Sequence, residues 1–209
     1  MHHHKYFLPE FLLFGVILQV IFFIIPIQIS AQTLKYDVIK GNKTIGNMQV
    51  KRLRNADTVQ YNIVSQVEFK LLLSFKIDYN LQEIFIDGIL VNGSATSWLN
   101  GRVQKQSAVK KDETAYKINV DNDLSELTTD GIVLSIPKLY FDRPEGHMEI
   151  FSQQFAGHLK MSKKSEDIYE LVSPDGKNTY TYENGICRQV KVYRTYANFS
   201  FKLVGIVTE

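Results

Sequence analysis

Apolar and polar side chains alternate from Val59 to Leu81 with a period of two residues. Of the twelve odd-numbered positions in this run, eleven are apolar or aromatic, and nine of the eleven even-numbered positions are polar. Successive side chains of a β-strand point to opposite faces of a sheet, so the pattern predicts strand and not helix. At about 3.3 Å per residue, one unbroken strand of this length would exceed the width of a small domain. We therefore expect the run to bend or to break into two strands near Phe69 to Leu72.

Turn-forming residues divide the rest of the chain into short segments with strand character. Asp87-Gly88, Asn100-Gly101 and Asn184-Gly185 are dipeptides that accept positive φ at both turn centres. Strands joined by such short turns must be antiparallel. The expected strands cover about residues 33–40, 44–53, 57–68, 72–86, 89–99, 102–110, 114–120, 147–155, 158–163, 167–173, 178–183, 186–194 and 197–207.

The segment from Asn122 to Gly146 interrupts this pattern. It contains Pro137 and Pro144, and proline cannot donate a hydrogen bond to a sheet ladder. We therefore expect a crossover or a rim segment here, beginning with a single helical turn over residues 123–127 that Asp123 caps. The predicted fold is all-β: a single antiparallel meander, strongly curved, that forms an open or nearly closed β-barrel with little helix.

The N-terminal segment is the longest apolar stretch of the chain. Residues 11–29 are interrupted only by Gln19 and Gln28 as polar residues, and the small residues Ser30 and Ala31 follow. This predicts that residues 1–31 are a signal peptide cleaved after Ala31, with an uncleaved N-terminal membrane anchor as the alternative. Residues 32–209 then form a single β-barrel-like domain. Both readings place this domain in the periplasm or at the outer membrane, with membrane contact only through the N-terminal segment if it is retained.

The charge balance, the cysteine count and the absence of phosphate-binding motifs argue against several classes of function. Lys and Arg number 24 against 22 Asp and Glu, and this near-neutral balance gives no reason to expect a nucleic-acid partner. The single cysteine, Cys187, excludes an intramolecular disulfide. The segment Gly41–Gly46 has P-loop glycine spacing, but Asn47-Met48 stands where Lys-Ser/Thr is required. We expect no cofactor.

One group of residues has the composition of a metal or acid/base site. His147 and Glu149 would share a face of one strand, and His158 follows the next predicted turn. These three residues are the candidates for a hydrolase or a metal-dependent enzyme. Exposed histidines on neighbouring strands need no function, so we expect neither a metal site nor catalysis.

Several short motifs together resemble a known family. They are Tyr36–Ile39, Lys43–Gly46, Leu139–Pro144, Ser173–Gly176 and Tyr180–Gly185. The chain resembles a family of exported Bacteroidota proteins of unknown function, and it is loosely similar in strand order to the lipoprotein-carrier half-barrel group. The second resemblance implies a curved antiparallel sheet around an apolar cavity that holds acyl chains. This chain lacks the long helices that plug such half-barrels.

The apolar stripe leads to the main functional hypothesis. Phe69, Leu73, Phe75 and Ile77 would line the concave face of the curved sheet, where a domain without a helical plug must place side chains or a ligand. We therefore predict a non-enzymatic protein of the cell envelope that binds an apolar or lipid-like small molecule.

The proline-rich segment adds three candidate ligand-binding residues. Tyr140 and Phe141 would form a lip over an apolar mouth, where Arg143 would meet an anionic head group. Alternatively, Arg143 would pair with Asp142 or Glu145. The alternative function is a structural or protein-interaction module that holds an envelope protein partner at a sheet edge, such as the last strand from residue 197 to 207.

Overall fold

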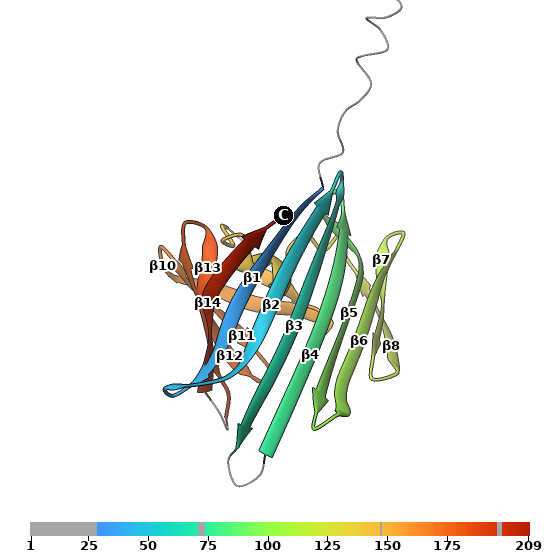
Figure 1. The fold of residues 1–209 in the computed structure, drawn as a ribbon. Helices are drawn as coiled ribbons and strands as arrows, with labels where there is room; N and C mark the ends of the chain where they lie inside the picture. The colour runs from blue at the N-terminus through green and yellow to red at the C-terminus, as the bar shows by residue number, and fades with distance from the viewer. Residues whose placement is uncertain (1–28, 71–73, 147, 196–197) are drawn as a thin grey trace, which may run out of the picture.

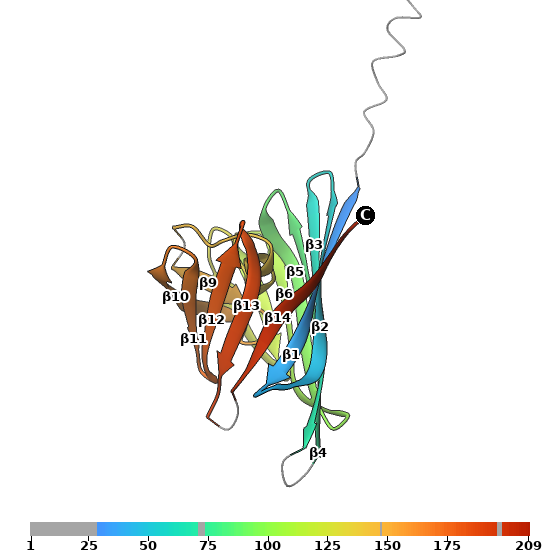
Figure 2. The same cartoon turned by 60° about the vertical axis from the view of Figure 1, so that its left-hand side comes forward.

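The computed structural model describes residues 29–70, 74–146, 148–195 and 198–209, which form one antiparallel sheet of fourteen strands. Figures 1 and 2 show that the sheet curls strongly, so that β10–β13 lie across a concave space from β3–β6. The spatial order is β8-β7-β6-β5-β4-β3-β2-β1-β14-β13-β12-β11-β10-β9. The fold is thus the expected antiparallel meander with almost no helix, and its sheet is not closed.

The strand boundaries follow the predicted segments closely. The strands are β1 (Ser30–Lys40), β2 (Lys43–Asn55), β3 (Thr58–Lys70), β4 (Ser74–Ile86), β5 (Ile89–Leu99), β6 (Arg102–Asp112), β7 (Ala115–Val120), β8 (Asp123–Thr128), β9 (Glu149–Ser152), β10 (Gly157–Ser165), β11 (Ile168–Ser173), β12 (Gly176–Glu183), β13 (Ile186–Tyr193) and β14 (Asn198–Thr208).

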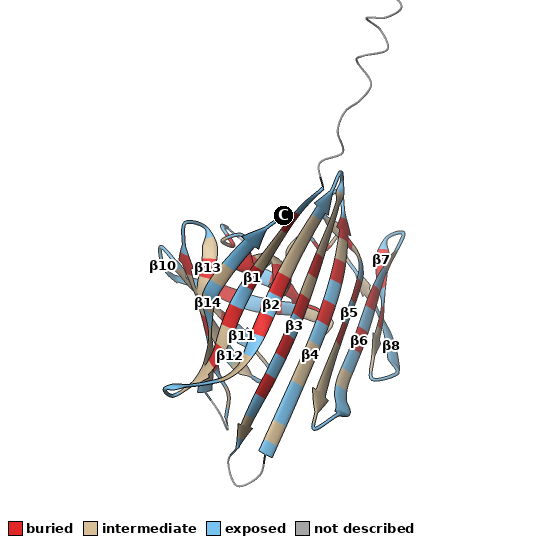
Figure 3. Cartoon of the chain, viewed as in Figure 1, coloured by how far each residue is buried: buried red, intermediate tan, exposed pale blue. Residues whose placement is uncertain are grey.

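The long alternating run breaks where its length required. β3 ends at Lys70, β4 begins at Ser74, and Phe69 pairs with Phe75 across the two strands. The odd-numbered positions of both strands face the concave side, as the alternating burial in Figure 3 shows for β3 and β4. In Figure 1 the end of β3 and the start of β4 lie at the bottom of the molecule.

The expectation of a helical turn at residues 123–127 is wrong, because this segment is strand β8. Asp121 and Asn122 have φ angles of 52° and 76°, the conformation of a two-residue hairpin turn. The Asn119 side-chain oxygen accepts a hydrogen bond from the Asn122 backbone N–H at 3.0 Å. The turn residues therefore come directly before Asp123, which begins strand β8 and does not cap a helix.

The expectation that the last strand is a sheet edge is also wrong. β14 is hydrogen-bonded on both sides, to β1 and to β13, so the two ends of the meander meet in the middle of the sheet. The edges of the described sheet are β8 and β9, and the chain between them crosses over, with residues 129–146 and 148 described.

This crossover runs inside the curled sheet instead of along its rim. Its 3-10 helix η2 (Ile136–Tyr140) packs against β3, β9 and β13. Tyr140 stacks edge-on against Tyr36, with ring centroids 5.4 Å apart, and Phe141 lies against Tyr61 at 5.8 Å. The crossover therefore supplies interior side chains that long helices supply in plugged half-barrels.

The predicted leader lies almost wholly outside the described residues, which begin at residue 29. β1 starts at Ser30, and Ala31 exchanges two backbone hydrogen bonds with Glu209, at 3.1 and 2.8 Å. Within the part of the chain that the structure describes, no helix has the length and hydropathy needed to cross a membrane.

Candidate ligand-binding cavity

A cavity of about 510 Å³ lies against the sheet, and its wall includes Phe69 near the end of β3 and Ile77 near the start of β4. Its wall is mainly apolar and comes from strands far apart in the chain. Pockets for small molecules have volumes of about 300–1,000 Å³ and mainly apolar walls, so both size and lining suit a small ligand. The apolar and aromatic residues of the wall are Ile45, Met48, Ile63, Val67, Phe69, Ile77, Tyr79, Leu81, Trp98, Leu99, Ile136, Tyr140, Phe155, Leu159, Leu171, Tyr180, Val192, Phe199 and Phe201.

The crossover forms the inner end of this cavity. Ile136 and Tyr140 of η2 line it, and Tyr140 packs edge-on against Tyr180 of β12, with 6.3 Å between ring centroids. Burial holds the pKa of the Tyr140 hydroxyl well above its usual range, so this group stays protonated. The inner end is thus a layer of packed, neutral aromatic side chains.

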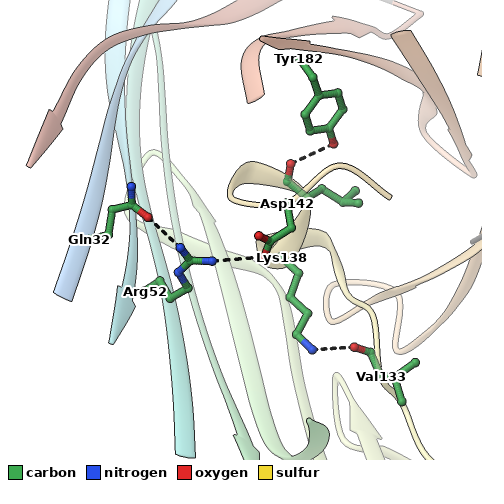
Figure 4. Close-up of polar contacts among 7 residues, drawn as sticks. Gln32, Arg52, Val133, Lys138, Asp142 and Tyr182 are labelled. Atoms are coloured by element: carbon green, nitrogen blue, oxygen red, sulfur yellow. Dashed lines mark hydrogen bonds and ion pairs between the residues drawn. The ribbon is translucent and has the colours of Figure 1, made fainter. Parts of the chain in front are cut away.

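Polar contacts hold the crossover in place, both against the sheet and within the crossover itself. Arg52 of β2 donates to the Asp142 carboxylate at 3.1 Å and to the Gln32 side-chain oxygen at 2.8 Å (Figure 4). Lys138 donates to the Val133 carbonyl at 2.6 Å. The Tyr182 hydroxyl donates to the carbonyl of residue 139 at 2.9 Å. The bonds of Asp142 with Arg52 and of residue 139 with Tyr182 join the crossover to the sheet, and the Lys138 bond stays within the crossover.

Three of the predicted ligand-binding residues line the cavity, namely Phe69, Ile77 and Tyr140. Phe75 supports the wall indirectly, because its ring stacks on Phe69 with centroids 5.4 Å apart. Leu73 lies outside the described residues. The alternating stripe of β3 and β4 therefore forms one wall of the cavity.

Phe141 and Arg143 lie on the other side of η2 and do not line the cavity. Phe141 is buried, with the Arg52 guanidinium 4.5 Å from its ring centroid. Arg143 pairs with Glu145, one of the two partners expected, and also with Asp167 at 2.9 Å. Since the crossover passes through the interior, these residues do not form the lip that a rim segment would have placed over a mouth.

The residues considered for a metal or acid/base site are only partly described. His147 lies outside the described residues, while Glu149 and His158 are exposed on the neighbouring strands β9 and β10. The His158 ring packs edge-on against Phe151 at 5.6 Å. Across the described ranges, no three His, Cys, Asp or Glu side chains come together in a way that could hold a metal ion.

A buried carboxyl group lies in the interior and was missed at the sequence level. Glu83 of β4 is fully buried, and the Ser135 hydroxyl of the crossover donates to its Oε2. Burial raises the pKa of Glu83 to about 8, and the Ser135 hydrogen bond and the Lys138 charge offset only part of this rise. The signal was present, because Glu83 continues the inward-facing series of Leu81 and Phe85.

Two basic residues at the open end of the cavity were also missed. Lys40 is the last residue of β1, Arg194 follows the last residue of β13, and both line the cavity. Each continues a series of inward-facing positions, at residues 36 and 38 and at residues 190 and 192. The period-two pattern could have placed both side chains, had it been followed to the ends of those strands.

Comparison with known proteins identifies a family and a fold. Residues 36–204 match the family model described as Domain of unknown function (DUF6134). The chain is similar to a crystal structure of a β-barrel-like protein of the domain of unknown function DUF1849 from Brucella abortus. That match has a TM-score of 0.54 and 12% sequence identity, and it covers 88% of this chain and 99% of the other. No curated protein matches the chain. At this level of identity the structural likeness shows the fold alone.

Proposed function

The chain belongs to the DUF6134 family, whose description names no activity, and we propose that it binds an apolar or lipid-like ligand in the cavity without catalysing a reaction. The observation that carries the proposal is the cavity itself. About 510 Å³ of space lies against the inward faces of β3 and β4, where close packing would otherwise fill a protein interior.

The driving force for such binding is burial of apolar surface. Removing apolar surface from water stabilises a complex by roughly 25 cal/mol per Å² before the costs of association are subtracted. The side chains of Val67, Phe69 and Ile77 present such surface on one wall, and those of Phe199 and Phe201 present it on another. A ligand between the two walls would contact apolar groups on both sides.

Substitution of a small cavity residue by tryptophan tests the proposal. Ser97 of β5 lines the cavity, whereas Ser94 on the same strand is exposed. We expect Ser97→Trp to fill much of the space and abolish binding of a naphthylamine dye, and Ser94→Trp to leave binding unchanged. Ser94→Trp is the matched control, because it places the same side chain on the same strand.

The natural ligand would be sought by native mass spectrometry of the full chain, followed by solvent extraction. A co-purifying apolar molecule near a one-to-one ratio, lost in Ser97→Trp and kept in Ser94→Trp, would support the proposal. Absence of dye binding to the unsubstituted chain, or equal binding by both variants, would refute it.

The location of this binding protein is part of the proposal. We infer from the apolar run at residues 11–29 that the chain is exported to the periplasm or the outer membrane, where apolar and lipid-like molecules are abundant. Cell fractionation tests this inference directly.

A second candidate function rests on the edge strand β8. Among the described strands it pairs with β7 alone, and Leu124 on it is 81% exposed. An open strand edge can add an extended segment of a partner protein by backbone hydrogen bonding. Cross-linking in envelope extract should then recover one stoichiometric partner that Leu124→Lys loses, and an empty result would count against this candidate.

A further inference from the structure

Two basic side chains face the cavity at its open end. Lys40 and Arg194 are both half-buried, and both belong to the cavity wall. Ile39 pairs with Ser200 of β14, and Val192 pairs with Phe199 of the same strand. The two basic residues therefore stand on either side of the start of β14, about two strand spacings, or roughly 10 Å, apart.

The contacts of these two cations among the described residues are with neutral groups. The Lys40 ammonium lies 4.4 Å from the ring centroid of Phe69. The Arg194 guanidinium donates to the Asn178 side-chain oxygen at 3.0 Å and to the carbonyls of Tyr193 and Lys177 at 2.9 and 3.3 Å. Over the described ranges, neither cation forms an ion pair within 4 Å.

One acidic residue stands near them. Asp175 lies in the turn between β11 and β12 and belongs to the cavity wall, but it is exposed. Its charge raises the pKa of Arg194 and only partly offsets the lowering by burial. Because solvent screens an exposed carboxylate, Asp175 neutralises the half-buried cations weakly.

Two other arginines, at or beside the crossover, do form ion pairs with carboxylates. Arg52 pairs with Asp142 at 3.1 Å, and Arg143 pairs with Glu145 and Asp167. Cations that are partly removed from water are most stable beside an anion. The open end of the cavity thus combines an apolar interior with two cations that have neutral partners in the described structure.

We propose that the ligand is an amphiphile with one anionic head group, carboxylate or phosphate, held between Lys40 and Arg194 with its hydrocarbon chain inside the cavity. This inference rests on the proposed function and specifies its ligand class. The hydrocarbon chain of the ligand lies against Val67, Phe69 and Ile77, and its head group remains near solvent. The positive charge expected at Arg143 from the sequence is thus supplied by two residues at other positions.

The test compares ligands that share one chain and differ in the head group. Hexadecanoate, hexadecanol and hexadecyltrimethylammonium would each displace a naphthylamine dye from the full chain, at concentrations below micelle formation. We expect hexadecanoate to bind at least about tenfold more tightly than hexadecanol, because a hydrogen bond to a charged group contributes about 1.5–3 kcal/mol, a factor of roughly 10 to 140. We expect the ammonium compound to bind most weakly.

Lys40→Gln and Arg194→Gln should each weaken the preference for hexadecanoate over hexadecanol. The double variant should remove this preference. Binding of hexadecanol should stay unchanged, which also shows that the variants are folded. Lys191→Gln is the matched control, because Lys191 is exposed on β13 three residues before Arg194. It should leave all affinities as they are.

The outcomes separate this inference from the function on which it depends. Equal affinities for hexadecanoate and hexadecanol, unaltered in the double variant, would overturn the anionic head group and leave apolar binding intact. Failure of all three compounds and of the dye to bind would overturn both. A lysophosphatidylglycerol with the same acyl chain distinguishes the sources: tighter binding than hexadecanoate supports a phospholipid head group, and weaker binding supports a free carboxylate.

Discussion

Replacement of Glu83 by glutamine should change how the stability of the fold depends on pH. Glu83 is fully buried, Ser135 donates to its Oε2, and its Oε1 has no hydrogen-bond partner among the described residues. Its pKa is raised from 4.5 to about 8, chiefly by burial. The folded protein therefore holds a proton on Glu83 at neutral pH, whereas the unfolded chain releases it.

The sign and size of the effect follow from this difference. A carboxyl group with a raised folded-state pKa contributes its full stability below the unfolded pKa and loses it as pH rises through the folded pKa. Between pH 4.5 and about 8, the free energy of unfolding should fall by roughly 1.4 kcal/mol per pH unit, on the order of 5 kcal/mol in total. Glu83→Gln has no proton to lose and should not show this fall.

The assay is urea unfolding at intervals from pH 4.5 to pH 8.5 for three proteins: the unsubstituted chain, Glu83→Gln and the control Glu68→Gln. Glu68 is an exposed glutamate of β3, so its replacement should leave the pH profile unchanged. The remaining ionisable groups are shared by the unsubstituted chain and Glu83→Gln, so their contributions cancel in that comparison. Parallel profiles for the unsubstituted chain and Glu83→Gln would refute the reasoning.

Further expectations concern a glycine, the cysteine and the N-terminal segment. Gly93→Ala should lower the free energy of unfolding by about 1–3 kcal/mol in urea titrations, because an added Cβ would lie 2.1 Å from Oε1 of the buried Gln153; unchanged stability would contradict this packing. Cys187 is fully buried and burial raises its pKa to about 12, so a thiol reagent should label it only after unfolding, and rapid labelling of the folded chain would contradict its burial. Mass spectrometry of the chain from fractionated cells should find an N-terminus at Gln32, or a retained segment in the membrane fraction if residues 1–31 are an anchor; an intact chain in the cytosol would refute both forms of the export hypothesis.

Most strands were predictable, because the period-two pattern reports which face of a strand is buried. Each of the thirteen expected segments contains a strand, and the end of β3 at Lys70 lies where the length of the run led us to expect a bend or a break. β8 was missed since its sequence, Asp123 to Thr128, has few apolar side chains and lies at an exposed edge. An edge strand with little buried surface leaves a weak hydrophobic pattern, and the preceding turn was the better signal.

The pairing of β1 with β14 could not be predicted from local pattern. Short turns determine which neighbours pair, but they say nothing about strands separated by the whole chain. The same limit applied to the crossover. Its prolines excluded a central strand, yet only tertiary contacts such as that between Arg52 and Asp142 show that it passes through the interior.

The position of the crossover explains why the candidate cavity lies at one end of the molecule. A curled sheet of this size must fill its concave space, and the buried side chains of Tyr140 and Phe141 fill part of it. The crossover joins the two sheet edges once, so it covers one level of the interior. Below η2, the cavity is bounded mainly by side chains of the strands, together with Phe155 of the turn between β9 and β10. The cavity is therefore the space that a single crossover leaves unfilled. Ile136 and Tyr140 form its inner end. Enlarging or truncating these two side chains should change the length of ligand that the cavity accepts.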